Sequence, residues 1–185
     1  MHSSEEFAEY VAGLSRHCRS IVVAFANAED QERPSDDPLF AELVGESSPY
    51  PSTDIMHFLA GMVVVARRKV AALLPEPERS SFTLAGFRQE TLDESKPGST
   101  RLTLHHSFNV IAETVPPVLD KTHLQQVLER FVAGFGFRGV VGLCLIYVKL
   151  AQEAQVADPA LTLDVVLARW ALEEEIDLGR PDYGD

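Results

Sequence analysis

The sequence predicts a mainly α protein, a single-domain bundle of five to seven helices around one buried helix at about residues 138–155. Apolar residues recur every three or four positions in several long segments, which is the helical period. The segment 140–150 is apolar on nearly every side, as is typical of the central helix of a bundle. The length of 185 residues and a hydrophobic content of 45% suit one globular domain over 1–185.

The N-terminal third is expected to contain two helices and two loops. A long helix is predicted over about 7–27, because its apolar residues fall on one face. A short helix over 38–45 is predicted to begin at a proline that follows an aspartate and to end at a glycine. The stretches 29–37 and 45–53 are predicted as loops, since both combine prolines with polar residues.

The remaining helices are predicted from the same apolar period. One is expected over about 53–74, where a proline stops it, and two more over 121–131 and 140–150. A last helix is expected from Asp158 and Pro159, which suit a cap and a first turn, to a terminating Gly179. The final residues, 180–185, are predicted to form a flexible tail.

The segment 82–111 is predicted to form one β-hairpin. Apolar and polar residues alternate over 101–110, which is the period of a half-buried strand, and the polar stretch 93–99 suits the connecting loop. A helix is the alternative, because Leu104 and Phe108 also lie at a helical step. The length of the alternation favours the hairpin.

Three glycines match the spacing of a dinucleotide-binding turn. Such a turn must follow a strand, whereas the residues before Gly134 have a helical pattern. We therefore predict that Gly134 and Gly136 end one helix and that Gly139 and Gly142 allow the next helix to pack closely. The alternative is an anion site at the start of that next helix, with Arg138 as the charge partner.

Histidines supply the candidate catalytic residues. His105 or His106 would act as general acid or base, with Glu113 as the carboxylate partner. The same histidines are the candidate metal ligands, but their spacing reproduces no established ligand pattern, so we assign no metal ligand and no cofactor. A pocket between helices and hairpin is predicted to be lined by His106, Phe108, Arg138 and Tyr147.

Arg67, Arg68 and Lys69 form the densest basic cluster. They are predicted to lie near a helix C-terminus, where positive charge is favourable, or to contact an acidic partner or an anionic ligand. Cys18 and Cys144 lie far apart in apolar surroundings, which predicts two buried thiols in a reducing compartment, and hence a cytoplasmic protein.

Charge is distributed unevenly along the chain. The 16 basic and 28 acidic residues give a net charge of −12, which argues against general nucleic-acid binding. Residues 1–54 hold 11 acids and 3 bases, and residues 151–185 hold 9 acids and 2 bases. The middle, 55–150, holds 8 acids and 11 bases. We therefore expect the functional surface in the basic middle.

No catalytic motif is recognisable, so the sequence favours a non-enzymatic interaction or regulatory module that binds a protein partner or itself. A homodimer is expected because Phe135, Phe137 and Trp170 exceed what the predicted internal faces require. A small anionic ligand is possible, and neither nucleic acid nor membrane is expected as a partner. The alternatives are a ligand-binding protein or enzyme that uses the histidine and carboxylate pocket, and a metal-binding protein that uses the same histidines.

Overall fold

The protein is mainly α-helical. The computed structural model describes residues 4–31, 33–114 and 121–171, which contain nine α-helices and one 3₁₀-helix but no strand. The elements are α1 (Ser4–Asn27), η1 (Pro34–Asp36), α2 (Pro38–Val44), α3 (Ser52–Leu73), α4 (Glu78–Ser81), α5 (Leu84–Glu94), α6 (Ser99–Thr114), α7 (Lys121–Phe135), α8 (Phe137–Ala157) and α9 (Leu163–Arg169).

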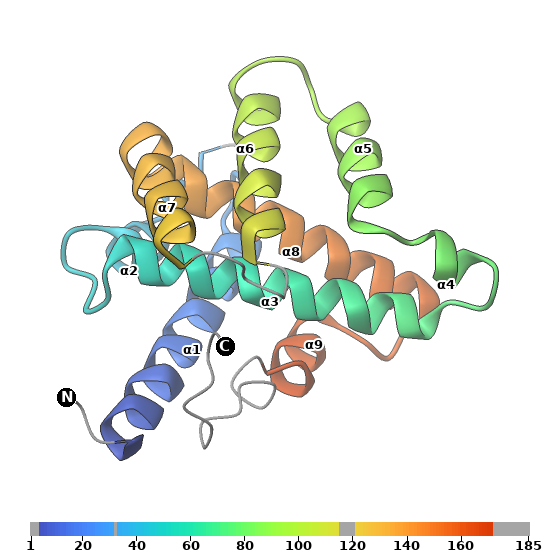
Figure 1. Ribbon diagram of the computed structural model, residues 1–185, viewed down its shortest axis with the longest axis horizontal. Helices are drawn as coiled ribbons and strands as arrows, with labels where there is room; N and C mark the ends of the chain where they lie inside the picture. Colours follow the sequence, from blue (N-terminus) through green and yellow to red (C-terminus); the bar gives the residue numbers. More distant parts are fainter. Residues whose placement is uncertain (1–3, 32, 115–120, 172–185) are drawn as a thin grey trace.

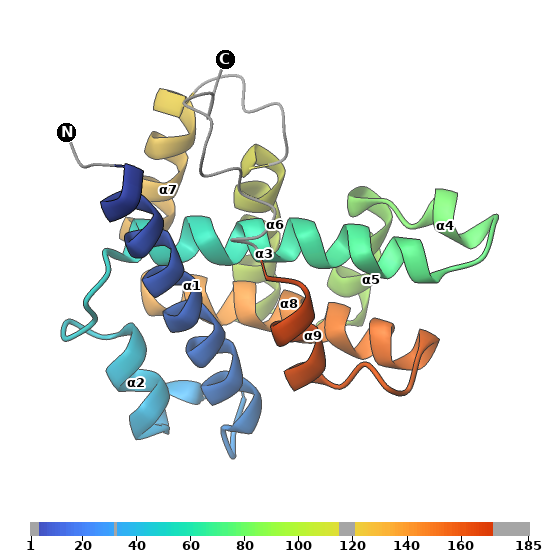
Figure 2. The same ribbon diagram turned by 90° about the horizontal axis from the view of Figure 1, so that it is seen from below.

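Two parallel helices, α3 and α8, form the centre (Figure 1). On one side of this pair lie α5, α6 and α7, and on the other side lie α1 and α9, with α2 against α1 (Figure 2). The predicted central helix is thus α8, but α3 shares its position. Both helices are apolar on several sides because each has neighbours on several sides.

The core contains both cysteines. Cys18 on α1 and Cys144 on α8 are free thiols with no exposed surface, which confirms that they are buried. Burial raises the pKa of each thiol, and for Cys18 the nearby Cys144 adds a smaller effect in the same direction. Neither side chain therefore offers a reactive thiolate.

The glycines between α7 and α8 have the structural roles that the sequence predicts. Gly136 adopts φ = 49° and separates the two helices, a backbone conformation that side chains disfavour. A Cβ at Gly142 would overlap the Ser107 Oγ, and one at Gly139 would lie 2.9 Å from the Phe131 ring. Gly142 therefore lets α6 approach α8 closely, and Gly139 does the same for α7.

The predicted hairpin over 82–111 is wrong, because this segment forms helices α5 and α6. Thr103 and Ser107 are polar but buried on α6, facing α8. Each hydroxyl donates a hydrogen bond of 2.8 Å to the backbone carbonyl four residues earlier, so the helix itself satisfies these groups. The buried face thus includes small polar residues, and the apparent alternation over 101–110 was a coincidence.

Several predicted boundaries also change. The last helix begins at Leu163 with Thr162 as its N-cap, whereas Asp158 and Pro159 lie in the preceding turn. The predicted terminator Gly179 and the predicted tail at 180–185 lie outside the described residues. The predicted count of five to seven helices is exceeded because the described residues also contain α5 and α6 in place of the hairpin and the short helix α4.

Among the described residues, α8 is the one helix whose length and apolar composition would suit a membrane crossing. Its buried residues include Leu143, Ile146 and Leu150, which have no exposed surface. Its place at the centre of the bundle therefore accounts for its composition.

Candidate functional site

The predicted histidine and carboxylate pair lines a groove between α6 and α7. This α6–α7 groove has a volume of about 490 Å³. Its apolar residues come from both helices, and its polar residues include one histidine, one asparagine, one arginine and one glutamate. It is lined by His106, Asn109, Val110, Ala112, Glu113, Val127, Arg130, Phe131 and Phe135.

His106 is half-buried and stacks on an aromatic ring in this groove. The ring centroids of His106 and Phe135 lie 4.7 Å apart at an interplanar angle of 39°. Glu113 lies two turns further along α6, where its Oε2 is 3.5 Å from the Nε2 of His123 on α7. Because both of these side chains are exposed, this ion pair contributes little to stability. His106 and Glu113 share the groove but have different partners.

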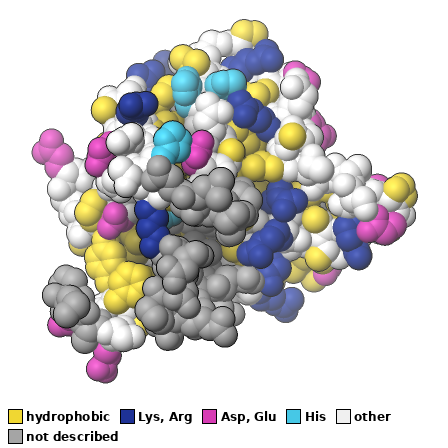
Figure 3. Space-filling view, in the orientation of Figure 1, with side chains coloured by type: hydrophobic (Ala, Val, Ile, Leu, Met, Phe, Trp, Pro, Cys, Tyr) yellow, Lys and Arg dark blue, Asp and Glu magenta, His cyan; other side chains and the backbone are white. Residues whose placement is uncertain are grey.

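His105 points to a different neighbour. Its Nδ1 lies 3.0 Å from the Nη2 of Arg88 on α5, outside the α6–α7 groove. Slight burial, the Arg88 charge and His106 together lower the pKa of His105. Histidine, arginine and lysine side chains are prominent over α5, α6 and α7 on the face in Figure 3. The two adjacent histidines therefore have different neighbours on either side of α6.

The other predicted pocket residues lie elsewhere. Phe108 is buried and packs edge-on against Phe87 at a centroid distance of 6.0 Å. Tyr147 is also buried on α8, and its hydroxyl has no hydrogen-bond partner within the described part of the chain. Arg138 is exposed at the start of α8. His106, Phe108, Arg138 and Tyr147 therefore do not line one common pocket.

The basic cluster on α3 is partly engaged within the protein. Arg67 donates a hydrogen bond of 3.1 Å from Nη1 to the Phe82 carbonyl, which links α3 to the segment before α5. Arg68 and Lys69 also have interactions within the protein. Across the described ranges, no group of three or more histidine, cysteine, aspartate or glutamate residues is placed to hold a metal ion.

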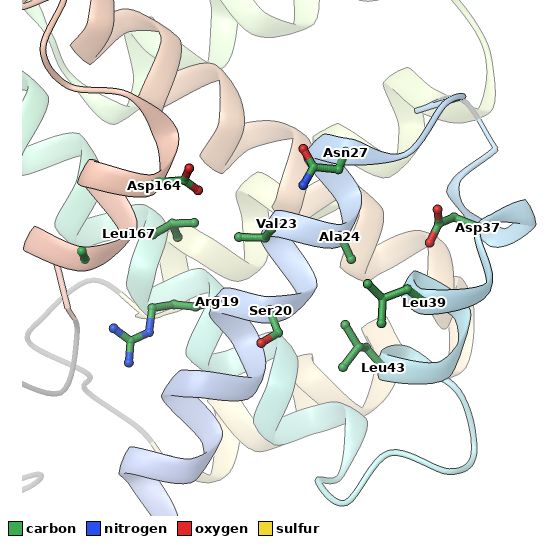
Figure 4. A pocket seen from close by; sticks show the side chains of 11 residues that line it. Arg19, Ser20, Val23, Ala24, Asn27, Asp37, Leu39, Leu43, Asp164 and Leu167 are labelled. Atoms are coloured by element: carbon green, nitrogen blue, oxygen red, sulfur yellow. The ribbon is translucent and has the colours of Figure 1, made fainter.

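A second groove lies on the opposite side of the molecule, where α2 and α9 flank α1 (Figure 4). This α1–α2–α9 groove has a volume of about 580 Å³ and is mainly apolar. It is lined by Arg19, Ser20, Val23, Ala24, Asn27, Asp37, Leu39, Leu43, Asp164, Leu167 and Ala168.

The wall formed by α2 has a defined local structure. Asp37 is the N-cap of α2, and its Oδ1 accepts a hydrogen bond of 2.9 Å from the Phe40 backbone N–H. Phe40 has no exposed surface and packs against Phe25 and Phe137, which anchors α2 to α1 and α8. The preceding residue, Leu39, is 57% exposed. Phe40 therefore fixes α2 to the core, whereas the adjacent Leu39 is exposed to solvent.

The sequence did not predict this groove, because its charge pattern placed the functional surface within residues 55–150. The groove joins residues from the two acidic ends of the chain, 19–43 and 164–168. A local signal existed, since Leu39 and Leu43 lie one helical turn apart, on a different side of the helix from the buried Phe40. No signal in the sequence showed that α9 would lie beside α1.

The aromatic residues that suggested a homodimer pack inside the protein. Phe135, Phe137 and Trp170 are half-buried and lie against the hydrophobic core. They therefore do not identify a surface between two copies of the chain. Self-association remains a prediction without a structural location.

Comparison of the chain with protein-family models, with curated proteins and with solved structures finds no match.

Proposed function

We propose that the protein is a non-enzymatic interaction module that binds a protein partner through the α1–α2–α9 groove. The observation that carries this proposal is the 57% exposed Leu39 at the edge of a groove whose other leucine and valine side chains are partly or fully buried. An exposed leucine alone is ordinary, but here it joins Leu43, Val23 and Leu167 around one hollow. Such a surface is typical of a binding site for another protein.

The arrangement of the reactive side chains supports a non-enzymatic role. The candidate histidines face different neighbours: His105 faces Arg88, His106 stacks on Phe135, and His123 faces Glu113. A general base normally needs a partner that fixes its orientation toward a substrate. Both cysteines are buried with raised pKa values, so they do not supply a nucleophile.

The proposal is tested by photo-crosslinking within cells that produce the protein. The photo-reactive residue p-benzoylphenylalanine replaces Leu39 in the groove or, as the control, Leu102 on α6, which lines neither groove. The two leucines are 57% and 54% exposed, so the positions are matched. We expect a protein to crosslink at position 39 only, and Val23→Asp in the groove floor to abolish that crosslink. The same crosslinked proteins at both positions, or an unchanged crosslink with Val23→Asp, would contradict the proposal.

A second candidate is a small-ligand or acid–base site in the α6–α7 groove, favoured because His106 and Glu113 both line it. Its apolar residues and its cationic Arg130 suit an aromatic carboxylate. NMR spectroscopy of the His106 imidazole during titration with benzoate tests this site, with benzyl alcohol as the uncharged control. Saturable shifts with benzoate that Arg130→Ala removes would support it, and equal shifts with both compounds would count against it.

A further inference from the structure

We infer that the occupant of the α1–α2–α9 groove is an amphipathic helix of a partner protein, with Lys or Arg at the end that lies beside Asp37 and Asp164. This inference rests on the function proposed above and specifies the chemistry of the partner. Three features of the groove carry it: the spacing of its floor, the nature of its walls and the charge at one end.

The floor of the groove is one stripe of α1. Ser20, Val23, Ala24 and Asn27 follow the helical steps of three and four, so they lie in a row along one face. At a rise of about 1.5 Å per residue this row is about 10 Å long. That length matches about two turns of a second helix laid along the floor.

The walls favour a helix over an extended segment. Leu39 and Leu43 lie on one side of α1, and Leu167 lies on the other (Figure 4). An extended peptide needs backbone partners, and neither the apolar walls nor any strand edge in the described residues supplies them. A helix satisfies its own backbone, so it can place apolar side chains at positions i, i+3 or i+4, and i+7 between these walls.

The charges at one end of the groove define the polar part of the partner. Asp37 on the α2 wall and Asp164 on the α9 wall lie near Asn27 at this end, and Arg19 lies toward the other (Figure 4). Neither aspartate forms an ion pair within the described portion of the chain. The cap hydrogen bond to the Phe40 N–H fixes the Asp37 carboxylate in place. A basic side chain at the corresponding end of the partner helix complements both acids.

The test selects binders of the full-length protein from two displayed libraries of equal peptide length, one of amphipathic helices and one of unconstrained sequences. We expect the helix library to yield peptides with three apolar residues at helical spacing and with Lys or Arg at one end. Circular dichroism of the purified variants confirms that each protein remains folded before affinities are compared.

Fluorescence anisotropy then measures the affinity of the selected peptides. We expect Leu39→Asp to weaken binding about tenfold or more, because it places a charge on the apolar wall. Asp37→Asn retains the cap and removes the charge, so it weakens binding about two- to fivefold, as does Asp164→Asn. Val156→Asp is the matched control, because Val156 is 82% exposed and does not line the groove, and it leaves affinity unchanged.

The contradicting results separate the two proposals. If only unconstrained peptides that stay non-helical bind in the groove, or if the selected helices lack a basic end, the inference fails and the proposed function stands. If neither library yields a binder that Leu39→Asp weakens, both fail. If light scattering shows a dimer that Leu39→Asp converts to a monomer, the occupant is a second copy of this chain and the inference is overturned.

Discussion

The two grooves differ in how their side chains are used. In the α6–α7 groove two lining side chains have partners, since His106 contacts the Phe135 ring and Glu113 pairs with His123 on α7. In the α1–α2–α9 groove the apolar Leu39 is exposed to solvent, and two aspartates at one end have no ion-pair partner among the described residues. Polar groups that already have partners within the protein add little binding free energy when a ligand contacts them. Burial of exposed apolar surface by a partner is favourable.

The comparison also changes the interpretation of the charge pattern. The sequence directed attention to the basic middle of the chain, and that middle does form the histidine- and arginine-rich surface over α5, α6 and α7 (Figure 3). The fold, however, brings the two acidic ends together around α1. The better candidate for partner binding is therefore at the ends of the chain.

The largest expected effect concerns the helix that forms one wall of the α1–α2–α9 groove. Phe40→Ala should lower the free energy of unfolding by about 3–5 kcal/mol, because it removes the buried ring that packs α2 against the core and leaves a cavity there. Leu39→Ala, at the adjacent exposed position, should change it by less than about 0.5 kcal/mol. Chemical denaturation measures both values. Equal losses would show that Leu39 is part of the core and not of a binding surface.

The next effect concerns the position of α6 beside the other groove. Gly142→Ala should lower the free energy of unfolding by about 1–3 kcal/mol, because the new methyl group would overlap the Ser107 hydroxyl. Adding Ser107→Ala should restore part of this loss, since it removes the closest atom, whereas the Thr103 Cγ2, 3.0 Å from the new Cβ, remains. Thermal unfolding of the single and double variants measures the coupling. Additive losses would contradict the close α6–α8 contact.

A smaller effect separates the two roles of Asp37. Asp37→Ala should destabilise the protein by about 1 kcal/mol, because the Phe40 N–H loses its acceptor. Asp37→Asn should change stability by only a few tenths, about 0.3 kcal/mol, since asparagine caps a helix equally well. Denaturant titration measures both variants. If Asp37→Asn lowers the free energy of unfolding as much as Asp37→Ala does, the carboxylate charge contributes to the stability of the fold, and its proposed role in partner binding loses support.

The smallest effect concerns the histidines. The Arg88 guanidinium helps to lower the pKa of His105, so Arg88→Ala should raise that pKa toward its ordinary value. Because the folded state disfavours protonated His105, this group makes the protein less stable as the pH falls through its titration range, and Arg88→Ala should lessen that loss. NMR titration of the imidazole protons measures the pKa. An unchanged value would show that Arg88 does not face His105 in solution.

The sequence predicted long helices well where one face is apolar. The helix α1 was identified because nearly all of its buried residues, such as Leu14, Cys18 and Phe25, are apolar and regularly spaced, with Ser15 as the one polar exception. For α6 the same reasoning failed, because Thr103 and Ser107 lie on the buried face and satisfy their hydroxyls within the helix. Hydropathy identifies a buried face only when apolar residues form it.

The candidate sites were predictable only in part. His106 and Glu113 are on the same chain segment, so their position in one groove follows once α6 is a helix. The α1–α2–α9 groove depends on Asp37 and Asp164 lying on opposite walls, although they lie 127 positions apart in sequence. Only the packing of α9 beside α1 creates that arrangement, and no local pattern encodes it.

The most direct test of the central claim compares photo-crosslinking from the two grooves in the same cells. The photo-reactive residue replaces Leu39 in the α1–α2–α9 groove or Asn109 in the α6–α7 groove. We predict that a partner protein crosslinks at position 39 and not at position 109, and that Val23→Asp removes the crosslink. A partner that crosslinks at position 109 alone would contradict the account.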